Sequence, residues 1–287
     1  MTDRPTTVTA TYERYAGDAP EIYERHFVPA IGAPYARRLL DAARLRDDER
    51  VLDVACGTGV AARLAAEAVG ATGSVAGVDA NPGMLAVARA ATPAGTSIAW
   101  HHGRAEALPV ADVSVDVVLC SLGFQFFADK AGALREMRRV LAPGGRLAIG
   151  TPGPTPALFQ ALDDVLADHL GPEASMFVDA VFSVHDPAEV RSMLDAAGLA
   201  DVEVTTAPLR LRLPPPADFL WQYVLGTPLA AVAASLDHEA RAALERAAVE
   251  RWRPFTDGDA LVLEVGSVVA TAHRPGQGPM DAEEAPK

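Results

Sequence analysis

The sequence is poor in residues on which several classes of enzyme depend. Its 287 residues include only two lysines, Lys130 and Lys287, and two cysteines, Cys56 and Cys120. Both cysteines lie in apolar segments, which predicts buried, reduced thiols and excludes a disulfide framework or a cysteine-bound metal cluster. The shortage of lysine leaves mechanisms that require a catalytic lysine with almost no candidate residue.

Long apolar runs and an excess of basic charge are also missing. No apolar run approaches the ~20 residues of a membrane span, and residues 1–11 are polar rather than a secretory signal. The 25 basic and 38 acidic side chains give a formal net charge of −13, which disfavours nucleic acid and anionic membranes as partners. We therefore expect a cytoplasmic protein whose partner is a small molecule.

The pattern of apolar segments predicts an α/β fold. In the first half of the chain, short apolar segments alternate with amphipathic, alanine-rich ones, as in βα repeats around a parallel sheet. The predicted strands are residues 51–55, 74–79, 97–101, 115–120, 146–150, 201–213 and 260–272. The predicted helices are residues 33–43, 60–69, 82–91, 130–141, 157–169, 187–197 and 217–252, with a loop from 170 to 184. This order predicts a doubly wound, Rossmann-like seven-stranded sheet with helical lid insertions.

The sharpest motif is a glycine turn between a strand and a helix at residues 51–60. Gly57 and Gly59 allow the backbone to approach a ligand closely, and the following helix offers unpaired N–H groups. Asp79 ends the next strand, at about the ~20-residue spacing from which a carboxylate reaches a ribose diol. With Ala62 the turn also satisfies the dinucleotide fingerprint in its G-x-G-x-x-A form. The motif predicts a cofactor that contains a nucleoside.

Asp53 distinguishes between the candidate cofactors. It lies in the strand just before the turn, where a pyrophosphate would face a buried like charge and a cationic ligand would be attracted. A phosphate-binding P-loop is excluded because no lysine follows Gly59. Reductases that use a tyrosine–lysine pair are disfavoured, because Lys130 has no tyrosine at the required helical spacing before it. An NAD(P)-dependent oxidoreductase remains the alternative from another class.

Five segments, taken in order, carry a family resemblance. Residues 51–60, 77–85, 103–109, 116–120 and 135–147 resemble the successive motifs of class I S-adenosylmethionine-dependent methyltransferases. The most similar branch contains the ubiquinone and menaquinone C-methyltransferases and many small-molecule methyltransferases of bacterial secondary metabolism. The resemblance implies S-adenosyl-L-methionine as the cofactor and methyl transfer as the activity.

The same resemblance implies a set of cofactor-binding residues. Those that would hold the methionine part and flank the sulfonium are Asp53, Ala55, Gly57, Gly59 and Ser121. Those that would contact the ribose and the adenine are Asp79, Ala80, Met84, Arg104, Ala105 and Glu106. Two positions depart from the family. Arg104 stands where an acidic residue is usual, and Ala55 replaces the first glycine of the loop, which is tolerable if its φ stays negative.

Few catalytic residues are expected, because methyl transfer is an in-line displacement that depends mainly on positioning. His26 is the first candidate for a general base, since it combines a place in an N-terminal lid with a pKa near neutrality; the alternative is a surface histidine. Gln125 is placed to orient a substrate carbonyl or the cofactor; the alternative is an amide that stabilises its loop. No residues have metal-ligand spacing, so no metal is expected.

The acceptor is expected to meet aromatic residues from three segments. Tyr23 and Phe27, with Tyr12 and Tyr15, resemble the family's N-terminal lid, and the others are Phe124, Trp221 and Tyr223. These residues predict a largely apolar pocket for an aromatic, polyketide or prenylated acceptor. The apolar segment near Trp221 is equally suited to a homodimer interface.

The chain is thus expected to divide into four parts. Residues 1–32 form lid helices, 33–150 the S-adenosylmethionine-binding core, 151–274 the rest of the domain with substrate-cap helices, and 275–287 a disordered tail. The predicted function is methyl transfer to a small, largely apolar acceptor, a secondary metabolite or quinone-like compound. The alternative within the same fold is an enzyme that uses the cofactor structurally for another reaction, such as a cyclisation.

Overall fold

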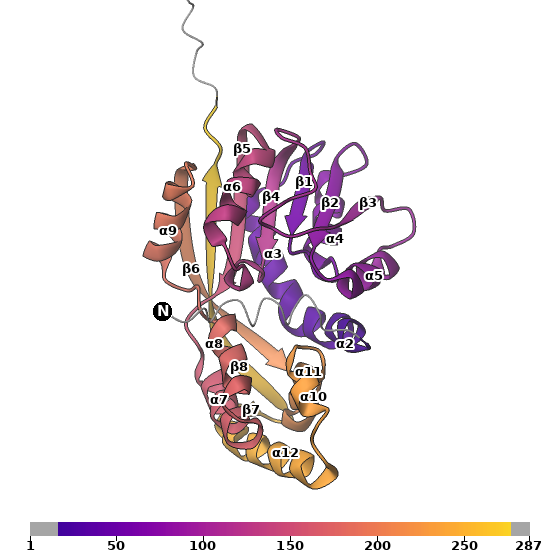
Figure 1. Cartoon of the computed structure of the whole chain (residues 1–287), viewed down its shortest axis with the longest axis vertical. Coiled ribbons are helices and arrows are strands. Elements are labelled where there is room, and N and C mark those ends of the chain that lie inside the picture. The colour runs from indigo at the N-terminus through magenta and orange to yellow at the C-terminus, as the bar shows by residue number, and fades with distance from the viewer. Residues whose placement is uncertain (1–16, 277–287) are drawn as a thin grey trace, which may run out of the picture.

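One mixed sheet runs through the protein (Figure 1). The structure, a computed structural model, describes residues 17–276, apart from the side chains of residues 172 and 173. The strand order is β3-β2-β1-β4-β5-β8-β6, and a short β7 pairs with β8. The strands are β1 (Arg50–Val54), β2 (Ser74–Asp79), β3 (Ile98–His102), β4 (Val115–Ser121), β5 (Leu141–Pro152), β6 (Ala200–Leu213), β7 (Thr256–Asp257) and β8 (Ala260–His273). The predicted seven-stranded sheet is confirmed, with two-residue β7 in addition.

The first five strands are parallel, and β8 runs antiparallel to both β5 and β6. Successive side chains of a strand point to opposite faces, so β1 supplies both hydrophobic cores. Val51 packs with helices α3 (Ala33–Ala43) and α4 (Val60–Val69) on one face. Leu52 packs with α6 (Lys130–Val140) and α9 (Pro187–Ala196) on the other. Helix α5 (Pro82–Ala91) lies beside β2 and β3.

Two long strands carry the chain beyond the sheet. Strands β6 and β8 have 14 residues each, against five in β1. Only residues 267–273 of β8 pair with β5, so residues 260–266 project past the carboxyl end of β5, where they pair with β6 and, at residues 260 and 261, with β7. In Figure 1 this ribbon descends into a second lobe, which we call the cap. Its helices are α7 (Ala157–Leu170), α8 (Pro172–Val181), α10 (Pro216–Leu225), α11 (Leu229–Ala233) and α12 (His238–Trp252), with the turn η3 (Arg253–Phe255).

Two expectations about the cap were wrong. The segment after residue 170, expected as a loop, contains α8: Gly171, at φ +87°, ends α7, and Pro172 occupies the first turn of α8 rather than breaking structure. The segment 217–252, expected as one helical stretch, is three helices. Gly226 caps the end of α10, and the Asp237 side chain accepts a hydrogen bond from the Ala240 N–H at 2.8 Å to begin α12.

A helical segment leads from the beginning of the described chain to the sheet. Helix α2 (Ala19–Ile22) continues into η1 (Tyr23–Gly32), a wide π-type helix, and then into α3. Helix η1 packs against α10 as well as α3, so it joins the cap to the sheet. Tyr12, Tyr15 and the tail at 277–287 lie outside the described residues. None of the described helices has the length and apolar character needed to span a membrane.

Trp252 anchors the cap core, and we expect its replacement to be costly. Its ring is fully buried, packs on Phe219 with centroids 5.7 Å apart, and donates from Nε1 to the Leu158 carbonyl at 2.9 Å, linking α12 to α7. Trp252→Phe should lower the free energy of unfolding by about 2–3 kcal/mol, because it removes a buried hydrogen bond and leaves a cavity. Trp221→Phe is the matched control. That partly exposed ring bonds Glu245 at 2.7 Å, so its loss should stay below about 1 kcal/mol. Equal losses in urea unfolding would contradict this role for Trp252.

Candidate functional site

A large cavity opens at the carboxyl edge of the parallel strands, between the sheet and the cap. Its lining residues come from the ends of β1, β2 and β4, from η1, and from the cap, and it encloses about 1560 Å³ with its open mouth included. Ligands of open α/β sheets bind at this edge. The lining runs from this edge to the cap, so the cavity borders both the expected cofactor site and the cap helices.

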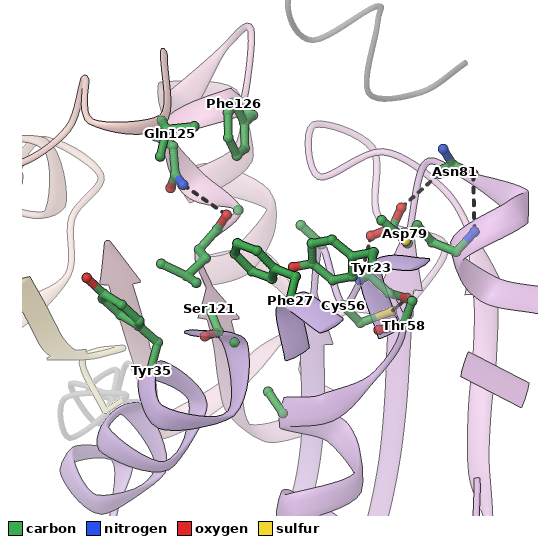
Figure 2. A pocket seen from close by; sticks show the side chains of 18 of the residues that line it. Tyr23, Phe27, Tyr35, Cys56, Thr58, Asp79, Asn81, Ser121, Gln125 and Phe126 are labelled. Carbon is green, nitrogen blue, oxygen red and sulfur yellow. Dashed lines mark hydrogen bonds between the residues drawn. The ribbon is translucent and has the colours of Figure 1, made fainter. Parts of the chain in front are cut away.

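The glycine turn is held in place by Asp79. One Asp79 oxygen accepts from the Gly57 N–H at 2.7 Å and the other accepts from the Asn81 N–H at 2.8 Å. Asn81 in turn caps α5 by accepting from the Gly83 N–H at 2.8 Å. In Figure 2 Asp79 and Asn81 lie together at one side of the cavity. Burial raises the pKa of Asp79 and these backbone hydrogen bonds oppose the rise.

Ala55 does not keep the negative φ that the sequence analysis required. Its φ is +56°, in the left-handed region where an alanine costs roughly 1–2 kcal/mol. Strand β1 must turn sharply into the loop at this residue, and the turn is supported by the Cys56 N–H, which donates to the Val78 carbonyl at 3.1 Å. The Ala55 methyl group also fills the space beside Gly123, where an added Cβ would lie 2.6 Å from it. The loops after β1 and β4 therefore touch at these two residues.

Asp53 is a buried carboxylate that the protein compensates only weakly. It is 1% exposed and lines the cavity, and neither of its oxygens accepts a hydrogen bond of normal geometry among the described residues. Burial raises its pKa to about 8; the Ala62 backbone N–H opposes this rise, the charge of Asp79 adds to it, and Arg63 opposes it. A buried acid of this kind is completed by a cationic ligand that donates hydrogen bonds. The ammonium and sulfonium groups of S-adenosylmethionine fit this requirement.

The remaining charged residues of the cavity lie on the same side as Asp53. Of the described residues that line it, only Asp53, Asp79, Arg104 and Glu106 are charged, and they belong to β1, to β2 and to the loop after β3. The Arg104 Nε lies 3.7 Å from a Glu106 carboxylate oxygen, a position in which Glu106 offsets the unusual arginine. Ala80, Met84 and Ala105 line the cavity nearby, and Ser121 lines it at the end of β4. We call this part the charged half.

The opposite side, toward the cap, has no charged residue among those described. Tyr23 and Phe27 of η1 stack with ring centroids 4.5 Å apart, and Figure 2 shows them between Asp79 and Tyr35. Three further aromatic rings complete this part, namely Phe159, Phe177 and Phe182. Tyr223 contacts two of them, with centroids 5.3 Å from Phe159 and 6.2 Å from Phe177. We call this part the uncharged half.

Sequence reasoning missed several of these residues. Tyr35, Phe159, Phe177 and Phe182 line the cavity but were not singled out, because rings at helical spacing are usual in any core. Thr58 was missed as well, although its hydroxyl is buried at the cavity without a hydrogen-bond partner. Aromatic residues repeated through α7 and α8 were the available signal, and the expectation of a loop at α8 concealed it.

Four residues predicted for the site lie outside the cavity. His26 is on the other side of η1 from Tyr23 and Phe27 and faces a separate shallow groove with Arg25 and Arg212. Phe124 is 1% exposed and packs in the hydrophobic core that the sheet forms with α6 and α9. Its neighbours Phe126 and Phe127 line the cavity instead.

Trp221 lies two residues before Tyr223 in α10, so the two side chains point to different sides of that helix. Trp221 faces α12, where it bonds Glu245. Gly59 is needed for the shape of the turn and does not line the cavity. Its φ is +86°, and an added Cβ would lie 2.3 Å from the Trp100 ring. Within residues 17–276, no three histidine, cysteine, aspartate or glutamate residues gather as a metal-binding group.

Comparison with known proteins agrees with this geometry. A family model described as a methyltransferase domain matches residues 52–149. A demethylmenaquinone methyltransferase of Staphylococcus aureus is 30% identical over 194 residues, which are 63% of this chain and 78% of that protein. The chain therefore belongs to the class I S-adenosylmethionine-dependent methyltransferases, and S-adenosylmethionine is its cofactor.

Solved structures show the same fold at lower identity. The YcgJ protein of Bacillus subtilis superposes with a TM-score of 0.56 at 21% identity, over 85% of this chain and 99% of that one. A phosphoethanolamine N-methyltransferase of Haemonchus contortus, in complex with S-adenosylhomocysteine, gives 0.60 at 19% identity, over 93% of this chain and 60% of that one. The [4+2]-cyclase SpnF gives 0.52 at 20% identity, over 85% of this chain and 81% of that one.

Binding of S-adenosylmethionine should release a proton from Asp53. At pH 7 a carboxyl whose pKa is raised to about 8 is mostly protonated, and a cationic ligand lowers that pKa and expels the proton. We expect close to one proton released per cofactor bound, measured by isothermal titration at pH 7 in buffers of different ionisation enthalpy.

Asp53→Asn should abolish that release and weaken binding, whereas Glu106→Gln, a second acid of the charged half, should keep it. Unchanged proton release in Asp53→Asn would show that the proton comes from another group.

The contact between Ala55 and Gly123 predicts a coupled pair of substitutions. Gly123→Ala places a methyl group against Ala55 and should destabilise the protein by about 1–3 kcal/mol through overpacking. Gly123 itself has φ −112°, which alanine adopts freely. Ala55→Gly removes both the obstacle and the left-handed strain, so in that background Gly123→Ala should cost less than about 0.5 kcal/mol. A double-mutant cycle in urea would decide the matter, and additive effects would exclude the contact.

Proposed function

We propose that this methyltransferase acts on a small, uncharged and largely apolar acceptor, a quinone-like ring compound or a related secondary metabolite. The observation that carries the proposal is the division of the cavity into a charged half and an uncharged half. A phosphate, carboxylate or ammonium group on the acceptor would be buried in the uncharged half without a partner, at high cost. The name of the Staphylococcus aureus relative, a demethylmenaquinone methyltransferase, supports the same acceptor class.

In this proposal the charged half holds the cofactor. Asp53 and the Gly57 loop receive the methionine part, Asp79 the ribose hydroxyls, and Ala80, Met84 and Ala105 the adenine, with Arg104 and Glu106 at its edge and Ser121 near the sulfonium. When bound, S-adenosylmethionine supplies an electrophilic methyl group on sulfur. The residues of the chain contribute binding and alignment, which suffice for an in-line displacement.

The uncharged half shields the acceptor and aligns it. It holds no histidine, lysine or carboxylate among its described residues, and burial raises the pKa of Tyr35 and Tyr223 far above neutrality. Neither tyrosine is therefore a base at pH 7, and the proton that the nucleophile loses passes to solvent. His26 has no part in this proposal, because it faces another groove. An acceptor that gives up its proton readily, such as a phenol or hydroquinone, suits such a site.

The proposal predicts turnover of an uncharged probe and not of a charged one. Purified protein with methyl-labelled S-adenosylmethionine should methylate 1,4-dihydroxynaphthalene and form one equivalent of S-adenosylhomocysteine per methylated product, measured by mass spectrometry. Phosphoethanolamine should give at least about a hundredfold less product, because its charges would be buried unpaired.

Asp53→Ala should abolish the reaction, whereas His26→Ala should retain it. Rearranged product without S-adenosylhomocysteine would instead favour the cyclisation alternative, for which the SpnF fold is a precedent of architecture alone.

A further inference from the structure

Gln125 is a polar residue in the lining of the cavity. It belongs to η2 (Phe124–Phe126), the single turn that follows β4, and its side chain lines the cavity at 6% exposure. Phe126 and Phe127 line the cavity beside it. In Figure 2 it is drawn on the side of Tyr35, opposite Asp79. A polar group so placed contacts whatever occupies the uncharged half.

The orientation of the Gln125 amide is fixed by the backbone. Its Nε2 donates to the Leu122 carbonyl at 2.9 Å, the dashed line at the left of Figure 2. Leu122 is itself held at φ +56°, and its N–H donates to the Gly150 carbonyl at 2.8 Å. Turning the amide over would put Oε1 against a carbonyl oxygen, which would repel it. The loop therefore uses the donor side of this amide.

The acceptor side remains free. The Gln125 Oε1 atom is buried and has no hydrogen-bond partner among the described residues. A buried carbonyl oxygen without a donor is unfavourable, and a ligand that supplies a donor removes that cost. A substrate carbonyl cannot do so, because it offers only acceptor atoms. The expectation that Gln125 orients a substrate carbonyl stays a prediction, whereas the unpartnered Oε1 atom requires a donor.

We infer that Gln125 is a specificity-determining residue that accepts a hydrogen bond from a hydroxyl group of the methyl acceptor. The acceptor is then an apolar ring compound with at least one neutral hydroxyl group. This inference rests on the proposed function, because it takes the uncharged half to be the acceptor site. Beyond that proposal, it requires the ring to carry a hydroxyl group, and it assigns recognition of that group to Gln125 Oε1.

Two ligands of equal shape test this inference. 1-Naphthol and 1-methylnaphthalene differ only by a hydroxyl in place of a methyl group, and equilibrium dialysis gives the Kd of each on protein saturated with S-adenosylhomocysteine. A pocket that is merely apolar prefers 1-methylnaphthalene, the less polar molecule. We expect the opposite, with 1-naphthol bound about tenfold more tightly or better.

Variants assign the preference to Gln125. Gln125→Leu and Gln125→Met remove the acceptor atom and should abolish the preference for 1-naphthol while S-adenosylhomocysteine still binds, which shows that the fold persists. Thr227→Val is the matched control. It removes another polar group that lines the cavity, one whose hydroxyl is already bonded to the Val224 carbonyl at 3.3 Å, and the preference should remain.

Each other outcome overturns the inference. Equal binding of the two probes to the wild type, or a preference that survives both Gln125 variants, removes the role of Gln125 and leaves the proposed acceptor site intact. If the Gln125 variants lose S-adenosylhomocysteine binding about tenfold and keep the preference, Oε1 serves the cofactor instead. Binding of neither probe refutes the proposed acceptor class, and this inference with it.

Discussion

The buried carboxylate of Asp53 is the constraint to which the rest of the site is fitted. A charge in an apolar interior must acquire a proton or a partner, and the described residues offer Asp53 only the Ala62 backbone N–H and the charge of Arg63, which do not offset its burial. In the ligand-free protein this raised pKa makes the fold less stable as the pH rises from about 4 toward 8, because the unfolded chain ionises more easily. The positive charge of the cofactor stabilises the ionised Asp53 carboxylate. The buried carboxylate that destabilises the fold therefore contributes to the affinity for the cofactor. Burial raises the pKa of Asp79 as well, but two backbone N–H groups donate to its oxygens and oppose that rise.

The cap owes its position to the length of β6 and β8. Because both strands continue past the last residue of β5, the cap is anchored by the ladder that completes the sheet, rather than by a flexible linker. The Tyr35 hydroxyl donates to the Gly266 carbonyl at 3.0 Å where that ladder leaves the sheet. Helix η1 closes the remaining side through its contacts with α3 and α10. The uncharged half is thus enclosed by rigid elements.

The sequence was informative where one local rule decides the structure. Helices α4 and α5 were predicted to their last residues, and strands β1 to β4 to within one residue, because glycine turns, a helix-starting proline and fully apolar strands mark them clearly; β5 begins at Leu141, five residues before its predicted start. The residues of the charged half were located because they follow those strands at fixed spacing. The failures lie where long-range packing decides. His26 and Tyr23 are three residues apart, and only the packing of η1 determines which of them meets the cavity. The φ of Ala55 depends on the path that β1 takes into the loop, which the local sequence does not determine. The aromatic rings of α7 and α8 line the cavity because the β6–β8 ladder positions the cap.

The division of the cavity has a consequence for how such proteins diversify. The four charged residues precede residue 107, and apart from η1 and Tyr35 the uncharged half is built from residues after 121. Recombination near the end of β4 would exchange one set and leave the sequence of the other unchanged, so one cofactor-binding segment can be inherited with many different caps. One point at which the two segments touch at the cavity is Ala55 against Gly123. A foreign cap should therefore be accepted most readily when its parent also has a glycine at the position after β4 that faces the first loop.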